Sequence, residues 1–236
     1  MWLTALVLVA LTVAKPIAQV PVVGVIAITI AAVMQLYLPI LRAEKAGGDA
    51  SWVGLHVQTW RTDVVNAGIL SLTVLPFYAL AYHALMTYAH GALELMGAHD
   101  LARLWPARVF APHIPANTAA FLAAAWWFVQ TAATHLLGVA LPEETFYRGY
   151  LQPQLELLMP PRARAFGVPL VRAVIITSAL FALGHFLGEW NIMRFGPFFP
   201  ALLFAWLRNA TGSVVGAIVF HATCNVFGAV LYTLYQ

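Results

Sequence analysis

Hydrophobic residues along the chain form long segments that are interrupted by polar linkers. The apolar segments cover residues 2–14, 18–41, 66–88, 117–141, 169–188, 197–207 and 212–235. A helix needs about 20 apolar residues to cross the hydrocarbon core of a bilayer, and several segments approach this length. Segments 2–14 and 197–207 are shorter, so we expect neighbouring helices to shield them or the bilayer to be thinner there.

The two main linkers, 42–65 and 89–116, carry Gly, Asp, Arg, His and Pro residues. No internal repeat and no low-complexity tract separates a soluble domain from the apolar segments. We therefore expect one all-α, polytopic membrane domain over 1–236. In this domain, 1–116 holds the first helices and linkers, and 117–236 holds the helices that carry polar motifs.

A separate helix is predicted to begin at Pro142, after a break at Leu141. Proline suits the first turn of a helix because its missing N–H needs no partner there. Two glutamates follow it, at the positive end of the helix dipole. Counting 143–158 as its own span predicts about eight transmembrane helices. The same count puts Glu143 on the membrane side where segment 169–188 ends.

Composition narrows the class of protein further. The chain is 62% hydrophobic and 9% charged, with a mean hydropathy of +0.82. Soluble domains contain about 25% charged residues, so this composition is typical of an integral membrane protein. The net charge of +3 suits contact with anionic lipid headgroups. No basic cluster with interleaved aromatic residues indicates a nucleic-acid partner, and the first apolar segment lacks the features of a cleavable signal peptide.

An acidic pair and an arginine are the most informative polar residues, in the sequence Pro-Glu-Glu-Thr-Phe-Tyr-Arg-Gly. Ionisable groups inside a membrane are functional hypotheses by default. Glu144 and Arg148 are four residues apart, in the order that favours an ion pair. Glu143 lies about 100° around the helix and is free to face a cavity. It could then act as a general base on water, although a charged helix cap is the structural alternative.

Two histidines in apolar segments are the next candidates. His185 follows Phe181 by four residues, so both project from one helix face. His221 and Asn225 have the same spacing, well inside the last apolar segment. Polar groups at such a depth need hydrogen-bond partners. The alternatives are an interfacial histidine at residue 185 and structural hydrogen bonding between helices at residues 221 and 225.

Other chemistries find less support. The chain has no Gly-x-Ser-x-Gly elbow, no His-Glu-x-x-His metal motif and no phosphate-binding loop. His83 and His135 are isolated in apolar segments, where we expect packing or interhelical hydrogen bonds. The single cysteine, Cys224, excludes an intrachain disulfide.

Three motifs follow one another in the second half of the chain. Residues 143–148 read EExxxR, Phe181 to His185 reads FxxxH, and His221 to Asn225 reads HxxxN. In this order and spacing the chain resembles the CPBP family of CAAX proteases and bacteriocin-processing enzymes, also called the Abi family. The Ras-converting CAAX endopeptidases are related to it. The first 116 residues resemble the family only in forming hydrophobic helices.

The resemblance implies an eight-helix intramembrane endopeptidase with a conical catalytic cavity. It also implies that Glu143 activates a water molecule with the help of His185. His221 and Asn225 would stabilise the oxyanion of the tetrahedral intermediate, and the arginine of the first motif would orient the acidic pair. The supporting positions are Glu144, Arg148, Phe181 and Tyr147.

The same residues raise the question of a metal. Glu143, His185 and His221 are plausible zinc ligands. However, Glu143 would then be needed both as a ligand and as a base, and Asn225 is a poor zinc ligand. Hydrogen-bond donors suit an oxyanion better than they suit zinc. We therefore expect a metal-free glutamate mechanism without a cofactor, with zinc as the alternative.

The expected partners are membrane lipids and a protein or peptide substrate delivered in the membrane. By resemblance, the cleaved bond lies near the substrate's C-terminus or in its leader. The substrate could be a prenylated tail, a bacteriocin leader or a C-terminal sorting tail. The Ala-, Leu- and Arg-rich composition favours a bacterial protein, and hence the bacterial cytoplasmic (inner) membrane.

Two other functions remain open at this stage. A non-catalytic membrane scaffold, or a bacteriocin-immunity-type protein, could share the fold, because fold does not fix function. A proton- or ion-coupled transporter could use the same intramembrane residues as a relay. The transporter would be expected to contain an inverted repeat, and none is evident in the sequence.

Overall fold

The structure is a computed structural model that describes residues 6, 7, 9, 21–104, 106–112, 114–159, 163–170 and 172–235. Most of the apolar segment expected at 2–14 lies outside these residues. The all-helical membrane class is confirmed, because four of the described helices are long and apolar enough to cross a bilayer. These four are Val22–Lys45, Trp60–Leu95, Thr118–Leu158 and Val215–Thr233. The count of eight spans and the conical cavity stay predictions.

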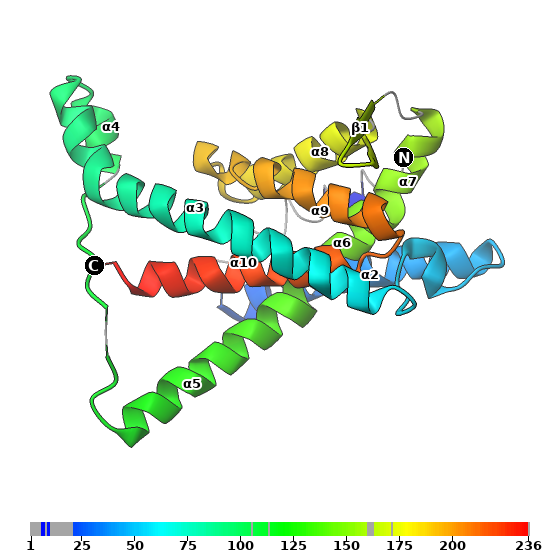
Figure 1. The fold of residues 1–236 in the computed structure, drawn as a ribbon, viewed down its shortest axis with the longest axis horizontal. Helices are drawn as coiled ribbons and strands as arrows, with labels where there is room; N and C mark the ends of the chain where they lie inside the picture. The colour runs from blue at the N-terminus through cyan, green and yellow to red at the C-terminus, as the bar shows by residue number, and fades with distance from the viewer. Residues whose placement is uncertain are drawn as a thin grey trace. The chain divides into compact units, whose positions relative to one another are not determined.

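The elements follow the predicted apolar segments closely (Figure 1). The α-helices are α2 (Pro21–Lys45), α3 (Trp60–Leu95), α4 (His99–Leu104), α5 (Thr118–Ala133), α6 (Leu141–Glu144), α7 (Gln152–Leu158), α8 (Arg172–Glu189), α9 (Phe198–Thr211) and α10 (Val215–Thr233). The 3-10 helices are η1 (Ala50–Val53) and η4 (Ile192–Phe195), and the π-helices are η2 (Thr134–Ala140) and η3 (Thr145–Leu151). A small antiparallel hairpin, β1 (Ala163–Ala165) and β2 (Val168–Leu170), precedes α8 and was not predicted.

The predicted break at Leu141 is wrong, because one helical run continues from Thr118 to Leu158. The π-helical turn η2 precedes Pro142, and such a turn shifts the hydrogen-bond register by one residue. The helical run therefore continues through Pro142, which has no backbone N–H to donate. At 1.5 Å per residue it is about 60 Å long, roughly twice the hydrocarbon thickness. A separate span 143–158 therefore does not set the membrane side on which Glu143 lies.

The chain divides into two compact units. The first comprises Met1–Ala67 and Leu136–His221, and the second comprises Gly68–His135 and Ala222–Gln236. The boundaries fall within α3, η2 and α10. The acidic pair and both motif histidines therefore belong to the first unit.

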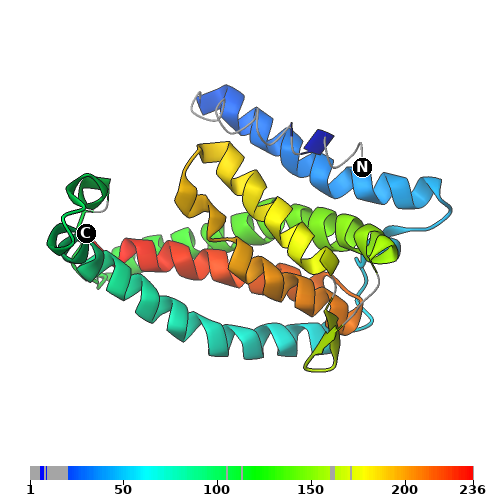
Figure 2. The same ribbon diagram turned by 90° about the horizontal axis from the view of Figure 1, so that it is seen from above.

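In the first unit, α8 packs alongside α9, and α2 runs alongside α6 and η3 (Figure 2). Its core contains several aromatic side chains. The largest fully buried apolar side chains include Phe146, Tyr147, Phe181, Phe204 and Phe220. These side chains come from η3, α8, α9 and α10, so the core joins the elements that carry the arginine and the histidines of the motifs.

A close backbone approach fixes η1 against η3. A Cβ atom added to Gly149 would lie 2.2 Å from the carbonyl oxygen of Val53. No real Cβ atom tolerates such a distance, so only glycine fits at this position. The glycine that follows the arginine of the first motif therefore has a packing role.

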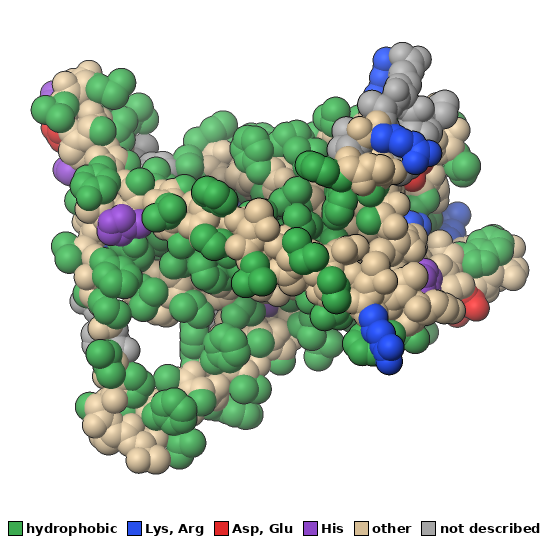
Figure 3. All heavy atoms as spheres, in the orientation of Figure 1, with side chains coloured by type: hydrophobic (Ala, Val, Ile, Leu, Met, Phe, Trp, Pro, Cys, Tyr) green, Lys and Arg blue, Asp and Glu red, His purple; other side chains and the backbone are tan. Residues whose placement is uncertain are grey.

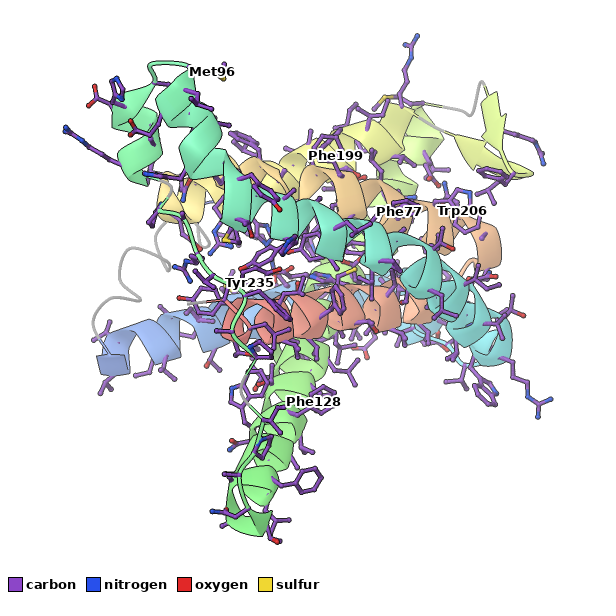
Figure 4. All side chains as sticks on the ribbon, turned by 60° about the vertical axis from the view of Figure 1, so that its left-hand side comes forward. Phe77, Met96, Phe128, Phe199, Trp206 and Tyr235 are labelled. Carbon is purple, nitrogen blue, oxygen red and sulfur yellow. The ribbon has the colours of Figure 1, made fainter. Side chains whose placement is uncertain are left out.

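In the second unit, aromatic side chains join α3 to the end of α10. The ring of Tyr235 lies 5.3 Å from Tyr82 and 5.4 Å from Phe110, and it is labelled in Figure 4. His83 Nδ1 lies 2.8 Å from the Tyr235 hydroxyl. The expectation of a structural role for His83 is therefore confirmed, although its partner lies just beyond α10 and not in a helix.

The outer surfaces of the helices are apolar. Large hydrophobic side chains are exposed along α3, α5 and α9, among them Phe77, Phe128 and Phe199 (Figure 4). In the space-filling view, hydrophobic side chains cover the helices, whereas Lys and Arg are few (Figure 3). Such surfaces suit lipid rather than water as the surrounding medium.

The packing of Gly149 yields a test of the fold. We expect Gly149→Ala to destabilise the protein by roughly 1–3 kcal/mol, because the new methyl group must push η1 away from η3. The measurement is the thermal unfolding midpoint in detergent. Gly91→Ala in α3 is the matched control, since nothing lies within 4 Å of its added Cβ. A Gly149→Ala protein as stable as the wild type would contradict the packing described.

Candidate active site

A buried ion pair lies at the centre of the first unit. The side chains of Glu144 and Arg148 have no exposed surface. Arg148 Nε lies 3.2 Å from Glu144 Oε2, and Nη1 lies 3.3 Å from Oε1. The predicted ion pair four residues apart is therefore confirmed. Arg148 Nη2 also donates to the carbonyl oxygen of Ala201 in α9, at 3.0 Å.

Aromatic rings complete the surroundings of the guanidinium. Arg148 Cζ lies 4.6 Å from the ring centroid of Phe181 and 5.3 Å from that of Phe204. A cation over an aromatic face is stabilised by the ring quadrupole, and more strongly where water is excluded. The arginine is thus held by a carboxylate, a backbone carbonyl and two rings at once.

Polar contacts between the helical run and α9 continue beyond the arginine. Gln152 Nε2 lies 2.9 Å from Asn209 Oδ1 and 2.9 Å from Glu156 Oε1. Asn209 Nδ2 donates to the same Glu156 oxygen at 2.9 Å. The carboxylate of Glu156 thus accepts from Gln152 of its own helix and from Asn209 of α9. The contacts fix the rotation of the helical run and hence the direction of its glutamates.

His221 meets the acidic pair from α10. Its Nδ1 lies 2.7 Å from Glu144 Oε1, and the imidazole is almost fully buried. The ring stacks on Phe204 at 4.7 Å with an interplanar angle of 12°, and it meets Phe181 edge-on at 5.7 Å. An ionised carboxylate can only accept a hydrogen bond, so Nδ1 donates to Glu144. Nε2 is the nitrogen left for other partners.

Glu143 faces that second nitrogen. Its Oε2 lies 3.8 Å from His221 Nε2, which is too far for a direct hydrogen bond. The oxygen is buried and has no hydrogen-bond partner among the described residues, while the side chain as a whole keeps 18% exposure. Two polar atoms at this separation can each bond to one water molecule placed beside them.

His185 belongs to the same aromatic cluster. Its Nδ1 lies 3.0 Å from the carbonyl oxygen of Phe181, and the two rings are 4.6 Å apart. The predicted common face of these two residues is therefore confirmed. Tyr147 packs edge-on against Phe181 at 5.1 Å. Because the Phe181 ring also contacts His221, it links the two motif imidazoles.

Asn225 follows His221 by one turn of α10, so both start from the same side of that helix. It lies in the second unit, and its role stays a prediction. In contrast, α9 contributes contacts that no motif indicated. Phe204 and the carbonyl oxygen of Ala201 hold the imidazole and the guanidinium, yet both lie in an ordinary apolar segment. The sequence offered one hint of these contacts: Arg148 and Gln152 are four residues apart, so both can face the same neighbouring helix.

A zinc centre does not fit the described geometry. Among the residues that the structure describes, no three His, Cys, Asp or Glu side chains are grouped so that they could hold a metal ion. Glu143, His185 and His221 are therefore not grouped as the three-ligand set that the zinc alternative requires.

Residues 124–227 match the sequence model of a family described as type II CAAX prenyl endopeptidase Rce1-like. This match confirms the resemblance to the CAAX proteases. The matched region includes the EExxxR, FxxxH and HxxxN motifs, whereas 1–123 lie outside it. No curated protein and no solved structure gives a significant match to the chain. The Rce1-like family is a protease family, so the match supports a CAAX-protease-like peptidase in a membrane setting.

The buried ion pair gives a prediction about stability. Arg148→Met should destabilise the protein by roughly 3–5 kcal/mol, because it leaves the carboxylate of Glu144 buried without its cation. The double variant Glu144→Gln/Arg148→Met should be destabilised by less than the sum of the two single changes. Thermal unfolding of all four proteins in detergent measures this coupling. Additive effects would show that the pair is not coupled.

Proposed function

We propose that the protein is an intramembrane endopeptidase that hydrolyses a peptide bond of a membrane-delivered substrate with a glutamate-activated water molecule. The observation that supports this most is the approach of a buried carboxylate oxygen without a hydrogen-bond partner among the described residues to the second nitrogen of an imidazole. Glu143 Oε2 and His221 Nε2 face each other at 3.8 Å, and Glu144 holds the far side of the imidazole. This arrangement suits a water molecule that donates one hydrogen to each group.

In the proposed first step, the water oxygen attacks the carbonyl carbon of the scissile peptide bond. Glu143 accepts the proton that the water loses, and the carbonyl oxygen takes up the negative charge. Proton transfer of this kind contributes about 10²–10⁴-fold to a rate. His185, which is linked to His221 through the Phe181 ring, assists the water by family analogy.

In the second step, the C–N bond of the tetrahedral intermediate breaks. The protonated carboxyl of Glu143 gives its proton to the leaving nitrogen, so that an amine and a carboxylic acid are released. The base is thereby restored for the next turnover. Protons and electrons balance without a metal or any other cofactor.

The hydrogen bond between His221 Nδ1 and Glu144 affects the role that His221 can play. The resemblance implies that this residue stabilises the oxyanion, which requires a proton on Nε2. In a neutral imidazole whose Nδ1 donates to Glu144, Nε2 carries no proton and can only accept. We therefore propose that neutral His221 orients the attacking water, and that the side-chain amide of Asn225 donates to the oxyanion.

The proposed substrate is a protein or peptide that reaches the site from the lipid, cut near its C-terminus or in its leader. A prenylated tail, a bacteriocin leader and a C-terminal sorting tail remain candidates. The proposed location is the bacterial cytoplasmic membrane, where lipids contact the exposed apolar helices. A non-catalytic scaffold or immunity-type protein of the same fold is the alternative, and intact Glu143 and His185 positions count against it.

The catalytic proposal predicts that Glu143→Gln lowers kcat by about 10²–10⁴-fold, because an amide cannot take the proton from water. His185→Ala should also reduce the rate. The measurement is cleavage of a membrane-delivered peptide by purified protein in proteoliposomes. Glu189→Gln is the matched control, since this exposed glutamate at the end of α8 pairs with Arg194 instead.

Wild-type rates in both variants would overturn the catalytic proposal. A complementary experiment in cells separates it from the scaffold alternative. If the Glu143→Gln protein restored a deletion phenotype fully, binding rather than catalysis would be the function. Loss of rescue, with normal protein levels in the membrane, is the result that the peptidase predicts.

A further inference from the structure

Three of the candidate membrane spans end at one side of the first unit. Helix α2 ends at Lys45, α3 begins at Trp60 and α10 begins at Val215. In both ribbon views these three helix ends point toward the right-hand side (Figure 1 and Figure 2). Because the polar ends of spans lie where hydrocarbon gives way to headgroups, this side of the unit is expected at the membrane boundary.

Hydrogen bonds fix these helix ends to one another. Val214 N, just before α10, donates to the carbonyl oxygen of Gly54 at 2.9 Å. In the first turn of α3, buried Asp63 accepts from Thr211 Oγ1 of α9 at 2.6 Å and from Thr59 Oγ1 at 2.8 Å. The surface at these helix ends is therefore a fixed part of the first unit.

The β1–β2 hairpin and the start of α8 join this surface through α9. Strand β2 packs against α9. In the first turn of α8, Ala173 and Val174 pack with Ala205 of α9. Ala205 precedes Thr211 by less than two helical turns, so the hairpin and the start of α8 lie near the end of α9 that is bonded to Asp63.

Among the described residues of this surface, exposed basic side chains outnumber exposed acidic ones. The basic side chains, which we call the basic rim, are Arg42, Lys45, Arg61, Arg164 and Arg172. The acidic side chains are Glu44 and Asp49. Lys and Arg side chains are seen on this side of the unit in the space-filling view (Figure 3). Such an excess of positive charge complements an anionic partner.

Tryptophan side chains stand among these charges. Trp52 is 59% exposed and Trp60 is 51% exposed. Arg61 Cζ lies 5.5 Å from the centroid of the Trp60 ring. The Trp52 ring lies against Gly48 in the turn after α2, where it leaves no room for a Cβ atom. Exposed tryptophans beside basic residues are typical of the headgroup level of a membrane.

The tip of the β1–β2 hairpin presents an apolar ring in a strained backbone conformation. Phe166 is 97% exposed, and its φ of +51° lies in the left-handed region that bulky residues rarely adopt. Gly167 follows with a φ of +79°, and turns with two positive φ values prefer Asn-Gly. Arg164 Nη1 donates to the carbonyl oxygen of Gly167 at 3.1 Å, which keeps a cation beside the ring. An exposed ring in such a place gains free energy from lipid and none from water.

We propose that the basic rim binds the phosphate groups of anionic phospholipids, with Trp52 and Trp60 at the headgroup level and the Phe166 ring inserted among the acyl chains. Guanidinium and ammonium groups donate to the phosphate oxygens and neutralise their charge. A lipid fits better than an acidic peptide, because apolar rings stand among the charges at the ends of three spans. The inference does not depend on the proposed peptidase function.

The test is a titration of the purified protein with phosphatidylglycerol in detergent, followed by native mass spectrometry. In the triple variant Arg61→Gln/Arg164→Gln/Arg172→Gln we expect about hundredfold weaker binding, since each basic residue contributes about fivefold. Uncharged phosphatidylcholine should bind the triple variant and the wild type equally. Arg194→Gln is the matched control and should bind like the wild type, because this exposed arginine lies at the opposite ends of α8 and α9.

Phe166→Asn separates lipid insertion from folding. Asparagine tolerates the left-handed region, so the thermal unfolding midpoint should stay the same or rise. Both lipids should bind about tenfold more weakly, because the acyl chains lose the ring whatever headgroup they carry. The wild type supplies a readout that needs no variant. Raising NaCl from about 0.1 M to about 0.5 M should weaken the binding of phosphatidylglycerol and leave that of phosphatidylcholine unchanged.

Three results would overturn the inference. The first is wild-type affinity for phosphatidylglycerol in the folded triple variant, or binding that salt does not change. The second is an equal loss of affinity in Arg194→Gln, since any exposed arginine would then serve. The third is displacement of phosphatidylglycerol by an equal concentration of soluble hexaglutamate, which would make the rim a surface for acidic peptides. None of these results decides the cleavage assay of Glu143→Gln, so the proposed function is tested separately.

Discussion

The ion pair of Glu144 and Arg148 is the constraint on which the rest of the site depends. Both groups are fully buried, in surroundings where an unpaired charge would be very costly. The structure offsets this cost with a two-point contact between the charges, a backbone carbonyl of α9 and two aromatic faces. Because the carbonyl and the two aromatic rings come from α8 and α9, the full set of contacts can form only when these helices have packed against the run that carries the ion pair.

This dependence on helix packing links the fold to the geometry of the candidate site. The oxygen of Glu144 that meets Arg148 Nη1 also accepts from His221 Nδ1, so the ion pair sets the orientation of the imidazole. Phe204 then fixes the plane of the ring by stacking on it. The result is an Nε2 atom that faces Glu143 Oε2, an oxygen without a hydrogen-bond partner among the described residues. For the proposed peptidase, these groups are thus held in place before a substrate arrives, and such preorganisation is a main way in which active sites lower barriers.

Sequence patterns predicted what depends on local spacing. Four-residue spacing predicted the Glu144–Arg148 pair and the common face of Phe181 and His185, because helix geometry alone decides both. Contacts between helices could not be predicted from the sequence, because no residue spacing relates Glu144 to His221, which lies in a distant segment. The break at Leu141 failed for another reason, because a π-helical turn let the helix continue through the following proline. The contacts from α9 could not be predicted either, because the sequence of an apolar segment does not show which backbone carbonyl will accept a hydrogen bond.

The most direct test of this account is the protonation of the His221 ring in the resting protein. Magic-angle-spinning NMR of protein labelled with ¹⁵N-histidine in lipid separates the two ring nitrogens, and comparison with His221→Gln assigns the signal among the eight histidines of the chain. The account predicts a proton on Nδ1, bonded to Glu144, and a bare Nε2. A proton on Nε2 alone would contradict it, because the carboxylate of Glu144 could then not be orienting the ring.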